Sequence, residues 1–369
     1  MLGMRRWLGF GVGAAALVAA AAPAAMEAPP ARAASFEGDQ LALSDGTTLR
    51  RARLGTLLRG QPRWETVADV MALGAAERRD WRLQRSACLP PVYRRCLFFL
   101  TEAGKAGVAL REYDTAARTF VAGGFDMPAG PHDAAWYDDN RIIIAADTGP
   151  GTVTAAGAPR LVKLWTRGTP AYAGTTILAA PFEAARVRPI FSLSGGGLFH
   201  AAEITRANGV RELYHFGWAQ NFRRSMLPGK AQLHDFFQGR AVARVDEPWI
   251  DAGPGFSAGS VVAYPMAPLL GPGSQTLPEF AYAPPAGFAV VDARAGRDTL
   301  YVHLRGAGGD RLMAVRKGAP DWPATAVAVP GDGPMRLLAA SDLADVALIE
   351  RGGDRLFVVG RGRAREIRR

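Results

Sequence analysis

Short apolar runs alternate with turn residues along most of the chain after about residue 80. The run at 96–101, for example, is followed by a turn at Gly104 and by a second run at 108–113. Short turns rich in Gly, Asp and Asn are typical of β-hairpins. The same pairing recurs at 134–137 with 141–144, 197–203 with 211–216, 288–291 with 299–304, and 346–350 with 355–359. The pattern predicts an almost entirely β protein made of consecutive antiparallel hairpins.

Only one stretch has a pattern that favours a helix. It covers residues 64–79, where one side could be lined by Val67, Val70, Met71 and Leu73. Strands alternating with long helices would indicate a parallel sheet, and the chain lacks that alternation. A propeller uses about 40–50 residues per four-stranded blade, so residues 60–369 would fill six or seven blades. We therefore predict an all-β fold, a β-propeller of six or seven four-stranded blades with one short N-terminal helix.

The first 34 residues have the pattern of a secretory signal. Arg5 and Arg6 precede an apolar run at 8–22, and the small residues at 31–33 form a cleavage site, with a second candidate at 22–24. A membrane anchor is the alternative, but a span needs about 20 apolar residues, and this run is short and rich in Ala and Gly. We expect export to the periplasm or the medium, with no membrane attachment after cleavage.

The formal net charge of +10 at pH 7 raises the question of nucleic-acid binding. Most arginines are scattered along the chain, which is typical of a solvated surface. One dense basic run lies at the end of the chain and is interpreted as a frayed, solvated tail: Arg361, Arg363, Arg365, Arg368 and Arg369. We expect no nucleic-acid partner. We also expect no metal and no cofactor, because His132, His200, His215, His234 and His303 lack metal-ligand spacing.

The chain has two cysteines, Cys88 and Cys96, separated by a loop that contains Pro90 and Pro91. A pair this close can be joined across a hairpin in an oxidising compartment. The alternative is two buried free thiols in neighbouring strands. The predicted export favours a Cys88–Cys96 disulfide.

Several segments resemble the N-terminal, β-propeller part of the prolyl oligopeptidase family of serine peptidases. They are Trp64-Glu65-Thr66, 88–97, 108–114, Phe120-Val121 with Gly124-Phe125, 147–151 and 159–170. The resemblance is specific over about residues 60–175 and looser beyond. With the predicted signal at 1–34, the domain division is a linker or incomplete first blade at 35–62 and a propeller at 63–369.

The family resemblance also implies a catalytic domain that this sequence does not display. The family's Ser-Asp-His triad lies on an α/β-hydrolase domain, mostly C-terminal to the propeller, and the propeller restricts entry to short peptides. Such a domain needs a serine on a strained strand-to-helix turn, an imidazole base and a carboxylate. Since the chain ends at Arg369, about where a propeller would end, we expect no hydrolase domain within it.

One motif imitates a nucleophile elbow. Residues 255–259 read Gly-Phe-Ser-Ala-Gly, and Asp298 and His303 follow in the order of a hydrolase triad. An elbow needs an apolar strand before the serine and a helix after it. A Gly- and Pro-rich loop precedes Ser257, and a β-prone run follows it. We therefore predict no catalytic residue in this chain.

The sequence favours an exported, non-catalytic propeller that binds a peptide or protein through the loops at one face. A second hypothesis is the non-catalytic part of a split serine-type endopeptidase, whose hydrolase domain is supplied in trans by another chain. A third is a decayed fragment without function. A reading frame next to this one that encodes a hydrolase domain would favour the second hypothesis.

Overall fold

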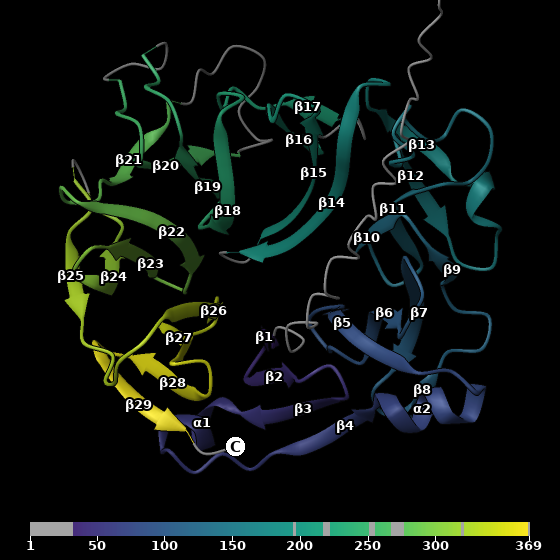
Figure 1. Ribbon diagram of the computed structural model, residues 1–369, viewed down its shortest axis with the longest axis horizontal. Helices are drawn as coiled ribbons and strands as arrows, with labels where there is room; N and C mark the ends of the chain where they lie inside the picture. Colours follow the sequence, from purple (N-terminus) through teal and green to yellow (C-terminus); the bar gives the residue numbers. More distant parts are fainter. Residues whose placement is uncertain are drawn as a thin grey trace, which may run out of the picture.

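The computed structural model describes residues 32–194, 197–216, 222–250, 255–266, 277–318 and 321–367. Seven four-stranded antiparallel units stand around a central axis and form a seven-bladed β-propeller (Figure 1). The second unit carries a fifth strand, β9, paired with β7. The prediction of an all-β propeller is confirmed, and of the two blade numbers expected the structure has seven.

The first three blades lie between residues 33 and 179 and include every helical segment of the described residues. Their elements are β1 (Ala33–Glu37), β2 (Gln40–Ser44), β3 (Thr48–Arg53), α1 (Leu54–Leu58), β4 (Glu65–Asp69), α2 (Val70–Glu77), β5 (Trp81–Cys88), β6 (Arg95–Glu102), β7 (Val108–Asp114), β8 (Thr119–Phe120), β9 (Asp126–Gly130), β10 (His132–Trp136), β11 (Arg141–Ala146), β12 (Leu161–Thr166), the 3-10 turn η1 (Ala171–Ala173) and β13 (Thr175–Ala179).

The remaining four blades contain strands alone in the described residues. Their elements are β14 (Ala184–Ser194), β15 (Gly197–Arg206), β16 (Arg211–Phe216), β17 (Phe222–Arg224), β18 (Ala231–Phe237), β19 (Arg240–Val245), β20 (Val261–Pro265), β21 (Glu279–Tyr282), β22 (Phe288–Ala295), β23 (Thr299–Gly306), β24 (Gly309–Arg316), β25 (Ala324–Val327), β26 (Met335–Ser341), β27 (Val346–Arg351), β28 (Arg355–Gly360) and β29 (Arg363–Ile367).

The hairpins expected from the sequence are all present. β6 pairs with β7, β10 with β11, β15 with β16, β22 with β23, and β27 with β28, each in antiparallel register. The second strand of most blades is nearly all buried, since it is sandwiched between the neighbouring blades; Ile142, Ile143 and Ile144 of β11 are examples. Apolar faces on both sides explain why these runs are continuous rather than alternating.

The ring closes by side-chain packing between the first and last blades. In the described residues each blade is built from consecutive strands, and β1 lies beside β26. Leu41 of the first blade and Leu348 and Ile367 of the seventh share one buried apolar cluster. Arg32 Nη1 also lies 2.7 Å from Oε1 of Glu350, whose side chain is 4% exposed. Within the described residues, this closure depends on burial and on the Arg32–Glu350 ion pair, without an exchanged strand.

Two expectations about the first 80 residues are corrected. Residues 35–62 were expected to be a linker or an incomplete blade, but with their neighbours they form the complete sheet β1-β2-β3-β4. The helix expected at 64–79 is shorter, because Glu65–Asp69 pairs with β3 as the outer strand of that sheet. Asp69 then caps α2 by accepting a hydrogen bond from the Ala72 N–H. The predicted signal lies mostly outside the described residues, and its boundary at 34 falls inside β1.

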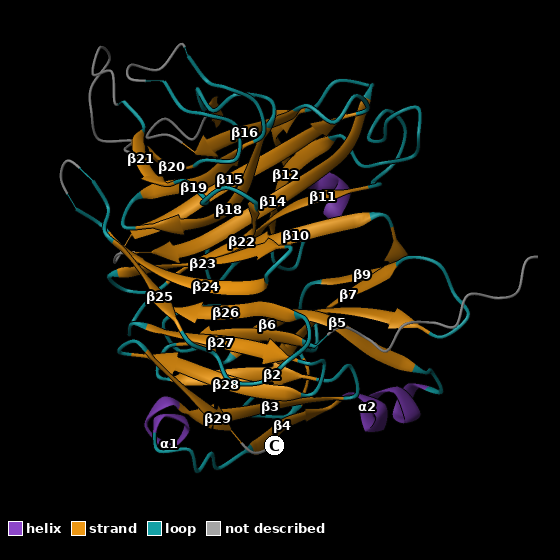
Figure 2. Cartoon of the chain, turned by 60° about the vertical axis from the view of Figure 1, so that its left-hand side comes forward, coloured by secondary structure: helices purple, strands orange, loops and turns teal. Residues whose placement is uncertain are grey.

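The two faces of the ring differ in the turns that they carry. We call the face with the turns between the first and second strands of each blade the upper face, and the opposite one the lower face. The turned view shows α1 and α2 at opposite ends of the strands (Figure 2). Because each blade has four antiparallel strands, β1 begins and β29 ends at the lower face.

Candidate functional site

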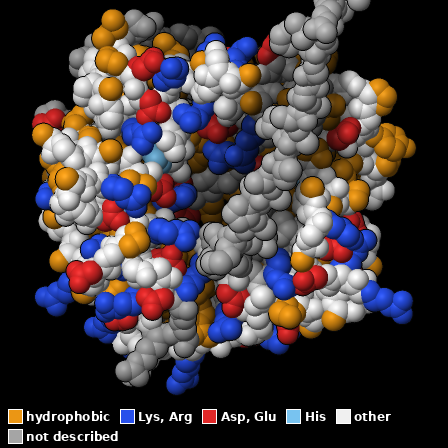
Figure 3. All heavy atoms as spheres, viewed as in Figure 1, with side chains coloured by type: hydrophobic (Ala, Val, Ile, Leu, Met, Phe, Trp, Pro, Cys, Tyr) orange, Lys and Arg blue, Asp and Glu red, His pale blue; other side chains and the backbone are white. Residues whose placement is uncertain are grey.

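The innermost strands of the blades line a central channel, and a cavity of about 300 Å³ lies within it. Six of the seven blades contribute to the cavity: Ser35 from β1, Cys88 from β5, Phe191 from β14, Asp235 from β18, Arg294 from β22 and Ala339 from β26. Tyr93 and Asp342, from turns of the upper face, complete its lining. The space-filling view shows the hollow, with basic side chains along its border (Figure 3).

A disulfide loop forms part of the cavity wall. Cys88 and Cys96 face each other across β5 and β6 with their Cα atoms 3.9 Å apart, and they are bonded as predicted. The bond closes the loop that carries Pro90 and Tyr93 into the cavity. Arg51 of the first blade donates a 2.8 Å hydrogen bond to the Tyr93 carbonyl oxygen. The loop is thus held covalently by the disulfide of the second blade and by a hydrogen bond from Arg51 of the first blade.

Arg51 also binds a buried carboxylate. Its Nη2 lies 2.6 Å from Oε2 of Glu37, whose side chain is 4% exposed. Burial raises the pKa of Glu37 to about 7, although the Arg51 charge opposes the shift. This carboxyl group therefore changes its protonation state near neutral pH. It follows Phe36, which lines the cavity.

The cavity at the upper face has an acidic side. Asp235 accepts hydrogen bonds from the Phe236 N–H at 2.8 Å and the Ala295 N–H at 2.9 Å. Burial raises the pKa of Asp235, and the Arg294 charge partly opposes this. Burial also raises the pKa of Asp342. A cation placed beside these carboxyl groups would favour their ionised forms and would itself be stabilised.

An adjoining cavity of about 340 Å³ has the opposite charge. It shares Cys88 and Phe191 with the first cavity and is lined by Arg85 of β5 and by Arg186 and Arg188 of β14. Asp133 of β10 bonds to Arg85 and lies 3.7 Å from Arg186, so two guanidinium groups share one carboxylate. Arg188 pairs more loosely with Glu203, at 3.4 Å.

Repulsion among these three arginines contributes to a lowered pKa of Arg85. Burial lowers the pKa of Arg85, and the charges of Arg188 and Arg186 lower it further against the opposing effect of Asp133. Positive charge in this wall therefore exceeds the carboxylate charge available to it. An anionic group entering the channel here would be stabilised.

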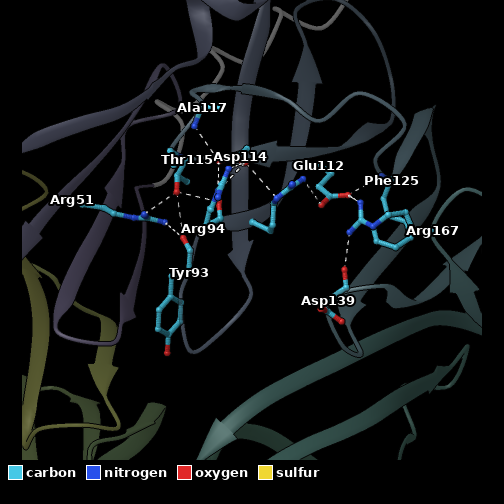
Figure 4. A network of polar contacts seen from close by, with 12 residues as sticks. Arg51, Tyr93, Arg94, Glu112, Asp114, Thr115, Ala117, Phe125, Asp139 and Arg167 are labelled. Atoms are coloured by element: carbon cyan, nitrogen blue, oxygen red, sulfur yellow. Dashed lines mark hydrogen bonds and ion pairs between the residues drawn. The ribbon is translucent and has the colours of Figure 1, made fainter.

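A buried polar network beneath the upper face holds the second and third blades together (Figure 4). Glu112 of β7 is fully buried and accepts hydrogen bonds from the Phe125 N–H, at 3.0 Å, and from Arg167. Arg167 follows β12 of the third blade and donates to the Asp139 carbonyl oxygen at 2.8 Å. Asp114, two residues along β7, has a pKa lowered to about 2, chiefly by its hydrogen bond with Arg94. These bonds are structural supports for the channel wall.

The three residues of the apparent hydrolase motif do not form a triad. Ser257 lies in the loop after β19, and its hydroxyl contacts the Ser260 hydroxyl at 3.0 Å. His303 is buried in the middle of β23, with Nε2 3.4 Å from Asp310. Burial lowers the pKa of His303.

Asp298 is separated from Ser257 by the thickness of the ring. It lies in the β22–β23 turn at the upper face, where Gln238 of the β18–β19 turn donates to its carboxylate at 3.3 Å. Ser257 follows the far end of β19, at the lower face. Beyond Ser257 comes strand β20, where an elbow would require a helix.

The described residues also bear on a metal site and on a membrane span. Within them, three or more His, Cys, Asp or Glu side chains never gather as a metal site would require. None of the helices described there is long and apolar enough to cross a bilayer.

The channel residues were missed at the level of the sequence. Arg85, Arg186 and Arg188 resemble ordinary exposed positions. Arg186 and Arg188 alternate with apolar neighbours, and Arg85 lies between Gln84 and Ser86. Only the ring geometry brings them together in the wall of one cavity. A signal was present in 184–194, where apolar and basic residues alternate for five residues, but it does not distinguish a channel wall from an outer surface.

No protein-family model matches the chain. In sequence the chain is 24% identical over 311 residues to the uncharacterized peptidase y4nA of Sinorhizobium fredii, covering 82% of this chain and 43% of that protein. In structure it resembles a post-proline cleaving enzyme from Rickettsia typhi, with a TM-score of 0.76, 15% identity, and coverage of 93% of this chain and 53% of that one.

Other solved structures give a similar result. Oligopeptidase B from Leishmania major matches with a TM-score of 0.60 and 11% identity, covering 91% of this chain and 48% of that chain. Prolyl oligopeptidase B from Galerina marginata matches with a TM-score of 0.61 and 9% identity, covering 89% and 48%. The chain therefore spans about half the length of the proteins that it resembles, and the matched part has the size of a propeller.

Proposed function

We propose that this chain, whose propeller resembles the propeller-sized part of the prolyl oligopeptidases, is an exported module that binds short peptides in its central channel. In this proposal it supplies no serine nucleophile of its own. The observation that carries the proposal is the charge separation along the channel. One cavity is lined by two carboxyl groups and one guanidinium, Arg294, and the adjoining one has excess guanidinium groups.

Charge separation of this kind fits a short peptide with free ends. The peptide ammonium group would lie near Asp235 and Asp342, whose pKa values burial raises. The peptide carboxylate would lie near Arg85, Arg186 and Arg188, where one guanidinium lacks a carboxylate of its own. Arg binds carboxylates well because its planar fork matches their geometry.

Calorimetric titration tests the proposal with a mixture of four-residue peptides that have free ends and uncharged side chains. The same mixture with amidated C-termini serves as the ligand control. We expect amidation to weaken binding by about ten-fold, since one charge-assisted contact contributes roughly 1.5 kcal/mol. We expect Arg186→Gln to weaken binding of the free peptides and to reduce the effect of amidation.

The matched protein control is Arg118→Gln. Arg118 is 56% exposed, similar to the 65% of Arg186, but it pairs with Glu65 on the outside of the first two blades. Its substitution should leave both affinities unchanged. Equal binding of free and amidated peptides by the wild-type chain would refute the assigned carboxylate position.

A second candidate function is the non-catalytic part of a serine-type endopeptidase, with the hydrolase domain on another chain. The relative with 43% coverage is described as a peptidase, which favours this candidate. Co-purification of the exported chain with an activated-serine protein from the same cells would support it. Recovery of the chain alone, able to bind peptides, would favour the first proposal.

A further inference from the structure

A second cavity, about 750 Å³ in volume, crosses the upper side of the seventh blade. Its lining comes from the β28–β29 hairpin, the β26–β27 turn, the β22–β23 turn and the end of β24 in the sixth blade, and α1 of the first. We call it the arginine cleft. It shares no lining residue with the two channel cavities, although Leu343 of the cleft follows Asp342 of the channel mouth.

The walls of the cleft are basic. Five arginines line it against two carboxylates, Asp298 and Asp345. They are Arg297, Arg316, Arg361, Arg363 and Arg365. The last three belong to the run that the sequence analysis interpreted as a frayed tail, but they lie in a hairpin, where β29 pairs with β28 over five residues.

The two carboxylates do not neutralise these arginines. Asp345 Oδ1 accepts the Asp298 N–H at 2.7 Å, and Asp298 accepts from Gln238 and lies 3.5 Å from Arg297. Within the described residues, the other four arginines form no ion pair, and all four side chains are exposed. The positive charge of the cleft is therefore available to a ligand.

The floor of the cleft is apolar. Leu58 and Leu343 are 43% and 55% exposed, and Val346 and Val358 lie beside them in the lining. A ligand that fills the cleft must therefore offer both negative charge and apolar groups. A phosphate or sulfated polyanion matches the walls and leaves the floor uncovered.

We propose that the arginine cleft binds an acidic peptide segment in which carboxylate and apolar side chains alternate. The volume lies within the range of about 300–1,000 Å³ of specific ligand sites. Arg363 and Arg365 point to the same side of β29, since side chains alternate along a strand. Carboxylates at every second ligand position would meet them, and the intervening part of the segment would cover Leu58 and Leu343.

Fluorescence anisotropy with a labelled peptide, Glu-Leu-Glu-Leu-Glu-Leu, tests this proposal. The peptide in which every Glu is replaced by Gln is the ligand control. We expect the acidic peptide to bind at least about ten-fold more tightly at low salt and to lose most of this advantage near 1 M salt. The double variant Arg363→Gln/Arg365→Gln should weaken its binding by about five-fold or more.

The matched protein control is Arg53→Gln/Arg59→Gln. Both residues are exposed and flank α1, but neither lines the cleft. The control removes two positive charges, as the cleft variant does, so the two variants have the same net charge. This control should bind as the wild-type chain does, and Arg186→Gln in the channel should also have no effect.

Three results would overturn the proposal. The Gln peptide could bind as tightly as the acidic one. The cleft and control double variants could lose affinity equally, which would mean that only net charge matters. A short heparin fragment could displace the acidic peptide at the same affinity, which would identify the cleft as a general polyanion surface.

Discussion

Substitution of Glu37 by Gln should alter the pH dependence of stability in a way that can be calculated from the structure. Glu37 is the last residue of β1, is 5% exposed, and faces Arg51 at 2.6 Å. Burial raises its pKa from 4.5 to about 7 despite the Arg51 charge. The folded protein therefore holds a proton on this group over a pH range in which the unfolded chain has lost it.

The sign of the effect follows from this difference. Below about pH 4.5 both states are protonated and Glu37 imposes no penalty. Between about pH 4.5 and 7 the unfolded chain ionises Glu37 while the folded protein keeps it protonated, so stability falls over this range and levels off above about pH 7. A shift of about 2.5 units at 1.36 kcal/mol per unit gives a loss of about 3 kcal/mol across this window.

Urea unfolding at pH values from 4.5 to 8.5 measures this loss. We expect the wild-type free energy of unfolding to fall by about 3 kcal/mol relative to Glu37→Gln between the two ends of the range. Any fixed cost of leaving Arg51 without its carboxylate shifts the whole Glu37→Gln curve and does not affect the slope. Glu65→Gln is the control, because Glu65 is 67% exposed and its removal should leave the slope unchanged. Parallel curves for wild type and Glu37→Gln would refute the assigned burial effect.

Two further predictions concern the Cys88–Cys96 disulfide and the Arg32–Glu350 ion pair. Replacing Cys88 and Cys96 together by Ser should lower the free energy of unfolding by about 2–3 kcal/mol, measured in urea; an unchanged midpoint would contradict a stabilising role for the bond. If the chain is exported with cleavage, its new N-terminus should lie upstream of Arg32, at the 22–24 candidate, because Arg32 pairs with the buried carboxylate of Glu350. Mass spectrometry of the exported protein that locates the new N-terminus beyond Arg32 would contradict this.

The hairpins could be predicted from sequence because their determinants are local. Turns such as Asn208-Gly209 and Gly352-Gly353 require positive φ at glycine, and the apolar runs on either side pair directly with each other. The first blade was missed because its evidence is tertiary. Glu65–Asp69 has a helical pattern in isolation, and only pairing with β3 makes it a strand.

The candidate sites were harder to predict than the fold. Arg363 and Arg365 look like part of a disordered basic tail, since their register with β28 is not visible in the sequence. Arg85 and Arg186 are distant in sequence, and only the ring brings them to one carboxylate, Asp133. In contrast, the interpretation of Ser257 depended on its immediate context, a loop before it and a strand after it, which the sequence already contained.

We propose that this propeller binds peptides and does not hydrolyse them with residues of its own. The most direct measurement incubates the purified chain with a fluorophosphonate probe and, in parallel, with proline-containing peptides followed by mass spectrometry. A serine hydroxyl reacts only when a base within hydrogen-bond reach accepts its proton, and Ser257 contacts Ser260 while His303 contacts Asp310. We predict an unlabelled protein and intact peptides. Labelling or cleavage that disappears in Ser257→Ala would contradict the account.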